Sequence, residues 1–394
     1  MISKKIKDVM RLGSAIRAMF EEGKRLADIY GKENVYDFSL GNPSVPAPKA
    51  VNEAIMQIAQ NTDALALHGY MLNSGFESVR EIIANNLNSR FGTAFAFKNI
   101  VMTVGAAGGL NVALKSIIND GDEVIVFAPY FGEYNNYVAN VGGKVVVIPP
   151  NPPTFQPDLS ALKSLIGERT KAVIVNSPNN PTGVIYGEDT LKELGKILKE
   201  QSEKKGEAIY LISDEPYREL VYGDNATPFL TKYYDNTIIG YSYSKSLSLP
   251  GERIGYLAIP DEAEDSENLI AACSVATRIL GFVNAPSLQQ LVIGQCIDEK
   301  TDVSAYDKNR KLLYTALTQY GFECVEPQGA FYLFVKSPIE ESKFVAKAKE
   351  YNILVVGGKS FGCEGYFRIS YCVSYDMIER SLPYFKQLAE ETIN

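Results

Sequence analysis

The sequence predicts an α/β protein with a large domain and a smaller α+β domain. Apolar runs alternate with helical stretches between residues 99 and 259, which indicates a mostly parallel sheet covered by helices on both faces. The pattern changes after about residue 285, where long helices and then short strands follow. A chain of 394 residues is also long for a single hydrophobic core, so we expect two domains.

The elements follow from local pattern. Residues 14–30 have helical periodicity, whereas the next segment, "FSLGNPSVPAPKA", contains Gly41 and three prolines and is expected to be irregular. Helical pattern resumes at "KAVNEAIMQIAQ", and further helices are expected over "GAAGGLNVALKSII" and roughly over residues 286–320. Strands are predicted in "NIVMTV", "DEVIVFAP", "KVVVIP", "KAVIVNSP", "EAIYLISDEPY", "TIIGYSYSK", "RIGYLAI", "GAFYLFV", "ILVVGG" and "YFRISYC".

These elements give the expected domain boundaries. The large domain is assigned to residues 49–310, and the small domain to residues 1–48 together with 311–394. The N-terminal segment is expected to pack on the small domain. No internal repeat or low-complexity linker interrupts the pattern.

Composition excludes several classes of function. The net charge of -8 and the lack of a basic block argue against a nucleic-acid partner. No apolar run approaches the roughly 20 residues that span a bilayer, and the charged start does not resemble a signal peptide, so we expect no membrane association. Five cysteines without a CxxC pair fit a reducing cytoplasm. Because His68 is the single histidine, a zinc site and a Ser-His-Asp triad are not expected.

Polar and aromatic side chains follow the predicted strands at the points where these end. Ligands bind at this edge of open α/β sheets. The expected site therefore combines a small-residue loop, an aromatic ring, an amide, a carboxylate, a phenol and an amine: Ala106 and Ala107, Phe131, Asn180, Asp214, Tyr217 and Lys245.

The small-residue loop suits a phosphate. "GAAGGL" opens a predicted helix, whose N-terminal amides can bind an anion, and Ala106 and Ala107 leave the backbone accessible. Ser242 can add a hydroxyl, and Arg253 can add a planar cation. The loop matches neither GxGxxG nor the Walker sequence, and alone it can equally be a structural turn.

A lysine beside a phosphate anchor suits a Schiff base with pyridoxal phosphate. Asp214 would hold the proton on the pyridine nitrogen, Tyr217 and Asn180 would donate to the phenolate oxygen, and Phe131 would stack on the ring. Structural alternatives stay open for each residue: Asp214 as a helix cap, Asn180 as a turn former and Phe131 as core. Lys245 itself can belong to an ordinary surface loop.

The ordered set of motifs resembles the fold-type I, class I/II aminotransferases, pyridoxal-phosphate enzymes related to aspartate aminotransferase. The motifs, spread over essentially the whole chain, are "SLGNPS", "HGYMLNSG", "TVGAAGGL", "PYF", "NNPTG", "SDEPY", "SYSK" with "GERIG", and "FRISYC". The resemblance implies that Lys245 forms the Schiff base, that Ser242 and Arg253 bind the phosphate, and that Asp214 and Tyr217 bind the ring.

The resemblance also implies roles that local chemistry does not give. Arg368 would bind the substrate α-carboxylate together with Asn180, and Gly41 would lie on a mobile segment over the site. Tyr70 would cross a homodimer interface to the cofactor phosphate of the neighbouring subunit. The expected reaction moves the amino group of an L-amino acid to a 2-oxo acid, 2-oxoglutarate being the expected acceptor.

The substrate class and two other functions stay open. Dicarboxylate-specific relatives use an arginine before an "NPP"-like turn, but here the turn is "NAP" and Arg278 lies about one residue out of register. The same fold supports C–S β-lyases and decarboxylases. It also supports ligand-sensing modules of regulators, although those carry a DNA-binding domain ahead of this region, and here the region starts near residue 14.

Overall fold

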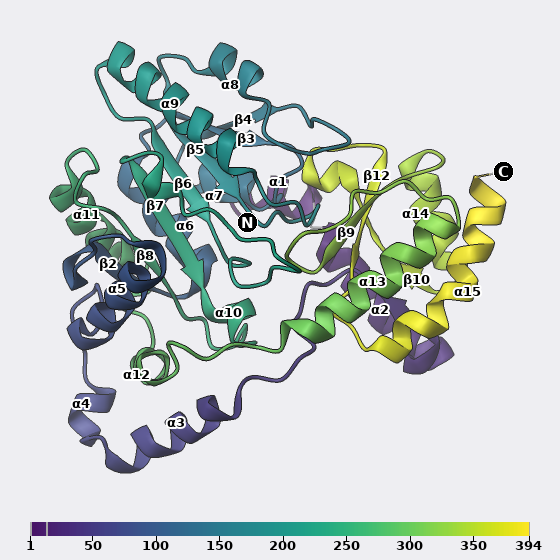
Figure 1. Ribbon diagram of the computed structural model, residues 1–394, viewed down its shortest axis with the longest axis horizontal. Helices are drawn as coiled ribbons and strands as arrows, with labels where there is room; N and C mark the ends of the chain where they lie inside the picture. Colours follow the sequence, from purple (N-terminus) through teal and green to yellow (C-terminus); the bar gives the residue numbers. More distant parts are fainter. Residues whose placement is uncertain (1, 13–14, 394) are drawn as a thin grey trace.

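The computed structural model describes residues 2–12 and 15–393, and its centre is a seven-stranded sheet (Figure 1). The strands lie in the order β2-β8-β7-β6-β5-β3-β4. Their bounds are β2 Ile100–Thr103, β3 Glu123–Phe127, β4 Lys144–Ile148, β5 Thr170–Asn176, β6 Tyr210–Asp214, β7 Thr237–Ser242 and β8 Gly255–Ala258. Neighbouring strands from β7 to β4 are parallel, while β8 runs antiparallel to both β7 and β2. The predicted mostly parallel sheet is therefore confirmed.

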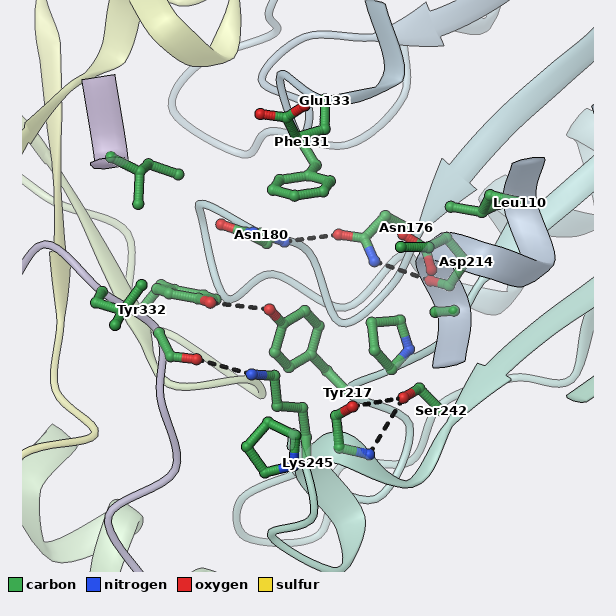
Figure 2. A pocket seen from close by; sticks show the side chains of 18 of the residues that line it. Leu110, Phe131, Glu133, Asn176, Asn180, Asp214, Tyr217, Ser242, Lys245 and Tyr332 are labelled. Atoms are coloured by element: carbon green, nitrogen blue, oxygen red, sulfur yellow. Dashed lines mark hydrogen bonds between the residues drawn. The ribbon is translucent and has the colours of Figure 1, made fainter. Parts of the chain in front are cut away.

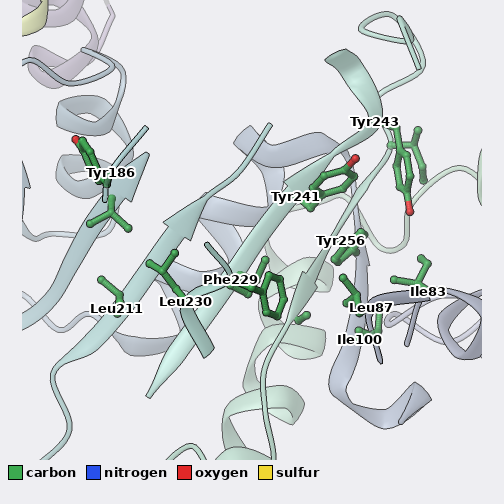
Figure 3. Packing of buried hydrophobic residues seen from close by; sticks show 14 of the residues in the cluster. Ile83, Leu87, Ile100, Tyr186, Leu211, Phe229, Leu230, Tyr241, Tyr243 and Tyr256 are labelled. Carbon is green, nitrogen blue, oxygen red and sulfur yellow. The ribbon is translucent and has the colours of Figure 1, made fainter. Parts of the chain in front are cut away.

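Both faces of the sheet are covered by apolar packing. Successive side chains of a strand point to opposite faces, and here they enter two different clusters. On β5, Val173 packs into one apolar cluster, while Ala172 and Ile174 pack into another. Figure 3 shows part of the first cluster, where Tyr256 of β8 lies near Leu87 and Ile83 of helix α5 (Glu77–Phe91), and Leu211 of β6 lies beside Leu230. The central strands are apolar over most of their length because neither face of the sheet meets water.

The covering helices come from the segments between the strands. Helix α6 packs against β7, β8 and α11, and α12 packs against α3 and α5. Their bounds are α3 Lys49–Asn61, α4 Ala64–His68, α5 Glu77–Phe91, α6 Gly105–Ile117, α7 Tyr134–Asn140, α8 Leu159–Leu165, α9 Glu188–Lys205, α10 Tyr243–Ser246, α11 Ser266–Ile279 and α12 Ser287–Gln295. In Figure 1, α3 and α4 extend away from the main body.

A second unit is built on its own core. Strands β9, β11 and β12 form an antiparallel sheet, and β1 pairs with β10 in parallel. The bounds are α1 Lys4–Leu12, α2 Ala15–Tyr30, β1 Tyr36–Asp37, α13 Val303–Gln319, β9 Tyr332–Lys336, α14 Glu341–Glu350, β10 Ile353–Leu354, β11 Val356–Gly357, β12 Tyr366–Ser370 and α15 Tyr375–Thr392. We propose the division into residues 49–310 and residues 1–48 with 311–394, with α13 bridging the boundary.

Local differences from the expected elements concern short helices. The helix expected over 14–30 occupies Ala15–Tyr30, and residue 14 lies outside the described residues. The run "TIIGYSYSK" does not stay extended to its lysine: β7 ends at Ser242, and α10 begins at the next residue. Ser242 causes the change, because its side chain accepts a hydrogen bond from the Ser244 amide and caps the helix. No described helix is long and apolar enough to cross a membrane.

Candidate active site

A cavity of about 450 Å³ opens at the carboxyl ends of the central strands. It is lined by eleven of the twelve residues expected from the sequence: Gly41, Ala106, Ala107, Phe131, Asn180, Asp214, Tyr217, Ser242, Lys245, Arg253 and Arg368. The exception is Tyr70, which is not among the described residues of the lining and is 94% exposed. Figure 2 shows Asp214 and Ser242 on one side of the site, Tyr332 on the other, and Lys245 beneath them.

Lys245 points its amine into this cavity from α10. Its Nζ donates a 2.7 Å hydrogen bond to the carbonyl oxygen of Gly41 and lies 5.4 Å from the centre of the Phe331 ring. Burial lowers the pKa of Lys245 from 10.5 to about 8, because the charged form loses its hydration. About a tenth of the amine is therefore uncharged at pH 7, far more than for an ordinary lysine, and a nucleophile or general base requires this uncharged form.

Asp214 ends β6 and has one carboxylate oxygen engaged. Tyr134 donates a 2.5 Å hydrogen bond to Oδ2, whereas Oδ1 is buried and has no partner in residues 2–12 and 15–393. Burial raises the pKa of Asp214 to about 7. An unpaired buried oxygen is costly, and a protonated ring nitrogen in the cavity would satisfy it.

The N-terminus of α6 lies at one end of the cavity, which Ala106 and Ala107 line. Gly105 has a φ of 78°, and a Cβ added to it would lie 3.0 Å from the Arg253 Nη2. Position 105 therefore requires glycine, because a side chain there would be strained and would crowd the guanidinium that lies beside the first amides of α6. Ser242 also lines this end, and its hydroxyl donates to the Ser244 hydroxyl at 2.8 Å.

Arg368 lies on β12 and is almost completely buried, with 1% exposure. Its Nη1 donates to Oδ1 of Asn180 at 2.9 Å, and its Nη2 donates to the carbonyl of Ser39 at 2.5 Å. Its Nε has no hydrogen-bond partner within the described part of the chain. The guanidinium also stacks over the Tyr332 ring, 4.5 Å from its centre. Such a planar buried cation suits a carboxylate.

Three residues of the site were missed by sequence reasoning. Tyr134 holds Asp214, Asn176 donates to the Asp214 carbonyl and accepts from the Asn180 amide, and the Tyr332 hydroxyl lies 2.8 Å from that of Tyr217. Asn176 precedes the "NNPTG" turn by three residues, so its place at a strand end was a usable signal. Tyr134 and Tyr332 gave no comparable signal.

The residues present fit pyridoxal phosphate. The cavity offers an amine of lowered pKa, the N-terminus of a helix, and two buried polar atoms that have no partner among the described residues, Oδ1 of Asp214 and Nε of Arg368. An α/β chain with this set at its strand ends is a pyridoxal-phosphate-dependent enzyme of fold type I. Residues 33–383 match the model of the family described as "Aminotransferase class I and II", and the chain belongs to this family. It is an aminotransferase, and its cofactor is pyridoxal phosphate.

Known proteins resemble the chain over nearly its whole length. Aspartate aminotransferase of Thermotoga maritima is 30% identical over 392 residues, which cover 97% of each chain. Aspartate/prephenate aminotransferase of Thermus thermophilus is 30% identical, covering 88% of this chain and 89% of that protein. A crystal structure of an amino transferase from Eubacterium rectale is 47% identical, with a TM-score of 0.97 and full coverage of both chains. The Thermus thermophilus aspartate aminotransferase with maleate is 26% identical, with a TM-score of 0.87 and coverage of 98% and 99%.

Proposed function

We propose that Lys245 is the cofactor-linked and proton-transferring residue of a transamination between an L-amino acid and 2-oxoglutarate. The observation that carries the assignment is its position: its amine, with a pKa of about 8, faces the cavity that Asp214 and Arg368 also line. When bound, pyridoxal phosphate supplies an aldehyde that condenses with amines and a ring that accepts electrons.

The other residues of the cavity bind and orient. The amides of Ala106 and Ala107, the Ser242 hydroxyl and Arg253 bind the phosphate. Asp214 holds the proton on the ring nitrogen, and Phe131 covers one face of the ring. Tyr217 and Asn180 donate to the ring oxygen.

Substrate handling is assigned to the opposite wall of the cavity. Arg368 holds the substrate α-carboxylate, with Asn180 beside it and the Gly41 segment over it. The Lys245 Nζ removes the proton from the substrate Cα. The 2.7 Å hydrogen bond from the Lys245 Nζ to the Gly41 carbonyl supports this role.

We further propose that the protein works as a homodimer in the cytoplasm. Tyr70 is 94% exposed in a single chain, and Leu65 and Leu72 beside it are 85% and 66% exposed. Exposed apolar side chains on an extending segment favour a subunit interface. All five cysteines are free, and four of them are buried, as in a reducing compartment.

A screen of amino acids against 2-oxoglutarate tests the proposed reaction. We expect 2-oxo acid formation beyond one equivalent per bound cofactor to depend strictly on the acceptor. Release of ammonia and pyruvate without an acceptor would instead identify a β-lyase, and release of carbon dioxide would identify a decarboxylase.

A further inference from the structure

One wall of the cavity has no assigned role in the proposed function. It is formed by Ile16 and Phe20 of α2 and by Leu40, which precedes the Gly41 segment. Helix α2 packs against β11, and β11 pairs with β12 so that Val356 lies opposite Arg368. In Figure 2 the purple N-terminal segment lies on the same side of the cavity as Tyr332. A substrate whose carboxylate is held by Arg368 therefore has this wall close to its side chain.

Among the lining residues that the structure describes, this wall is apolar and includes no buried cation. The described lining residues that carry a positive charge are Arg17, Lys245, Arg253 and Arg368. The last three already have roles in the proposed function. The side chain of Arg17 is 81% exposed and forms an ion pair with Glu21 at 3.4 Å.

Negative charge at the rim also disfavours an acidic side chain. Glu133 lines the same cavity, next to Phe131 in Figure 2, and accepts a 2.8 Å hydrogen bond from Asn136. A second substrate carboxylate placed against Ile16 and Phe20 would lose hydration without gaining a buried partner, which is costly. An aliphatic or aromatic side chain would gain from leaving water there.

We infer that the amino donor has an apolar side chain, and that Ile16 and Phe20 select it. This inference rests on the proposed function and names its substrate class. Burial of a leucine- or phenylalanine-sized side chain favours binding by about one to two powers of ten. Arg17, which is exposed and paired with Glu21, lies at the rim, where the distal carboxylate of the acceptor can stay in solvent.

Binding of unreactive carboxylates to the holoenzyme tests the inference without turnover. The probes are 4-methylpentanoate, 3-phenylpropanoate, succinate and acetate, with dissociation constants measured from the absorbance of the bound cofactor and by calorimetry. We expect 4-methylpentanoate or 3-phenylpropanoate to bind at least about tenfold more tightly than succinate. In parallel, kcat/KM for leucine and phenylalanine should exceed that for aspartate.

Variants of α2 test whether Ile16 and Phe20 cause the preference for apolar side chains. Ile16→Ala and Phe20→Ala should each weaken the two apolar probes several-fold and leave acetate unchanged, because acetate has no side chain to reach the wall. Ile16→Lys should shift the preference toward succinate. Ile29→Ala is the matched control: Ile29 lies on the same helix, is 57% exposed and is not among the described residues of the cavity, so all four constants should stay as in the wild type.

Two results would overturn the inference. One is tightest binding of succinate, lost in Arg17→Gln, which would assign the wall to a dicarboxylate. The other is an equal weakening of acetate and the apolar probes in Ile16→Ala and Phe20→Ala, which would mean that these residues only hold the helix. Failure of the proposed function looks different: no amino acid would convert the bound cofactor, and no carboxylate would bind.

Discussion

Tyr134 donates a 2.5 Å hydrogen bond to Oδ2 of Asp214, a residue that lines the cavity, while the buried Oδ1 has no partner in the part of the chain that the structure describes. Burial and the neighbouring carboxylate of Asp214 raise the pKa of Tyr134 well above its usual value, so the phenol stays protonated and remains the donor. The pair fixes the orientation of the carboxylate that we assign to the ring nitrogen of the cofactor.

Tyr134→Phe should therefore weaken cofactor binding. A hydrogen bond to a charged acceptor contributes about 1.5–3 kcal/mol, which corresponds to about a 10- to 150-fold loss of affinity. Equilibrium dialysis followed by absorbance measures this loss. Tyr130→Phe is the control, because Tyr130 stacks on Tyr134 but makes its hydrogen bond with Asn135. Equal affinities of the two variants would contradict the assignment.

Cofactor uptake should depend on pH through Lys245. Its pKa is lowered by burial to about 8, so its neutral fraction rises below pH 8, reaches one half at about pH 8 and approaches one at higher pH. Only the neutral amine attacks an aldehyde. We expect the rate of pyridoxal phosphate uptake by cofactor-free protein to rise about tenfold per pH unit below 8 and then level off. Stopped-flow absorbance measures it, and a rise that continues to about pH 10 would show an ordinary lysine.

Arg368→Lys should separate substrate binding from cofactor binding. A lysine keeps the charge but lacks the planar pair of donors, so we expect substrate and oxo-acid affinities to fall by about 10- to 150-fold. The cofactor dissociation constant should change little, because we assign the cofactor phosphate to the N-terminus of α6, away from Arg368. Spectral titration of the holoenzyme gives both quantities. Unchanged substrate affinity with weakened cofactor binding would mean that Arg368 has another role.

Mixed dimers test the proposed position of Tyr70. Tyr70→Phe alone should bind the cofactor about 10- to 150-fold more weakly, and Lys245→Ala alone should not turn over. In a hybrid of the two variants, one site combines the native Lys245 of one chain with the native Tyr70 of the other. Cofactor affinity and activity at that site should return to wild-type values. If Tyr70 acts within its own chain, mixing will restore nothing.

Much of this site was predictable because parallel strands place their carboxyl ends along one edge. Asp214, Ser242 and Ala106 follow buried strands in the sequence, and the structure brings them to the same cavity. The strand order was not predictable in this way. The insertion of antiparallel β8 between β2 and β7 depends on long-range pairing that leaves no local pattern.

Three aromatic residues of the site could not be predicted from the sequence, because they reach it through contacts between distant parts of the chain. Tyr134 reaches Asp214 from the first residue of α7, a helix that packs against β4 and α6, and 80 residues separate the two in sequence. Tyr332 and Phe20 reach the cavity from the second unit, through the packing of β9 and α2. Aromatic residues at such positions look like ordinary core, so their role appears only once the two units are placed together.

Borohydride reduction of the holoenzyme, followed by peptide mass mapping, tests the central assignment most directly. Reduction makes the link between cofactor and protein permanent, so the modified residue can be identified. We predict loss of the visible absorbance band and a single pyridoxyl phosphate group on Lys245. A modification on any other lysine, or an unmodified Lys245 in fully reduced and inactivated protein, would contradict the account.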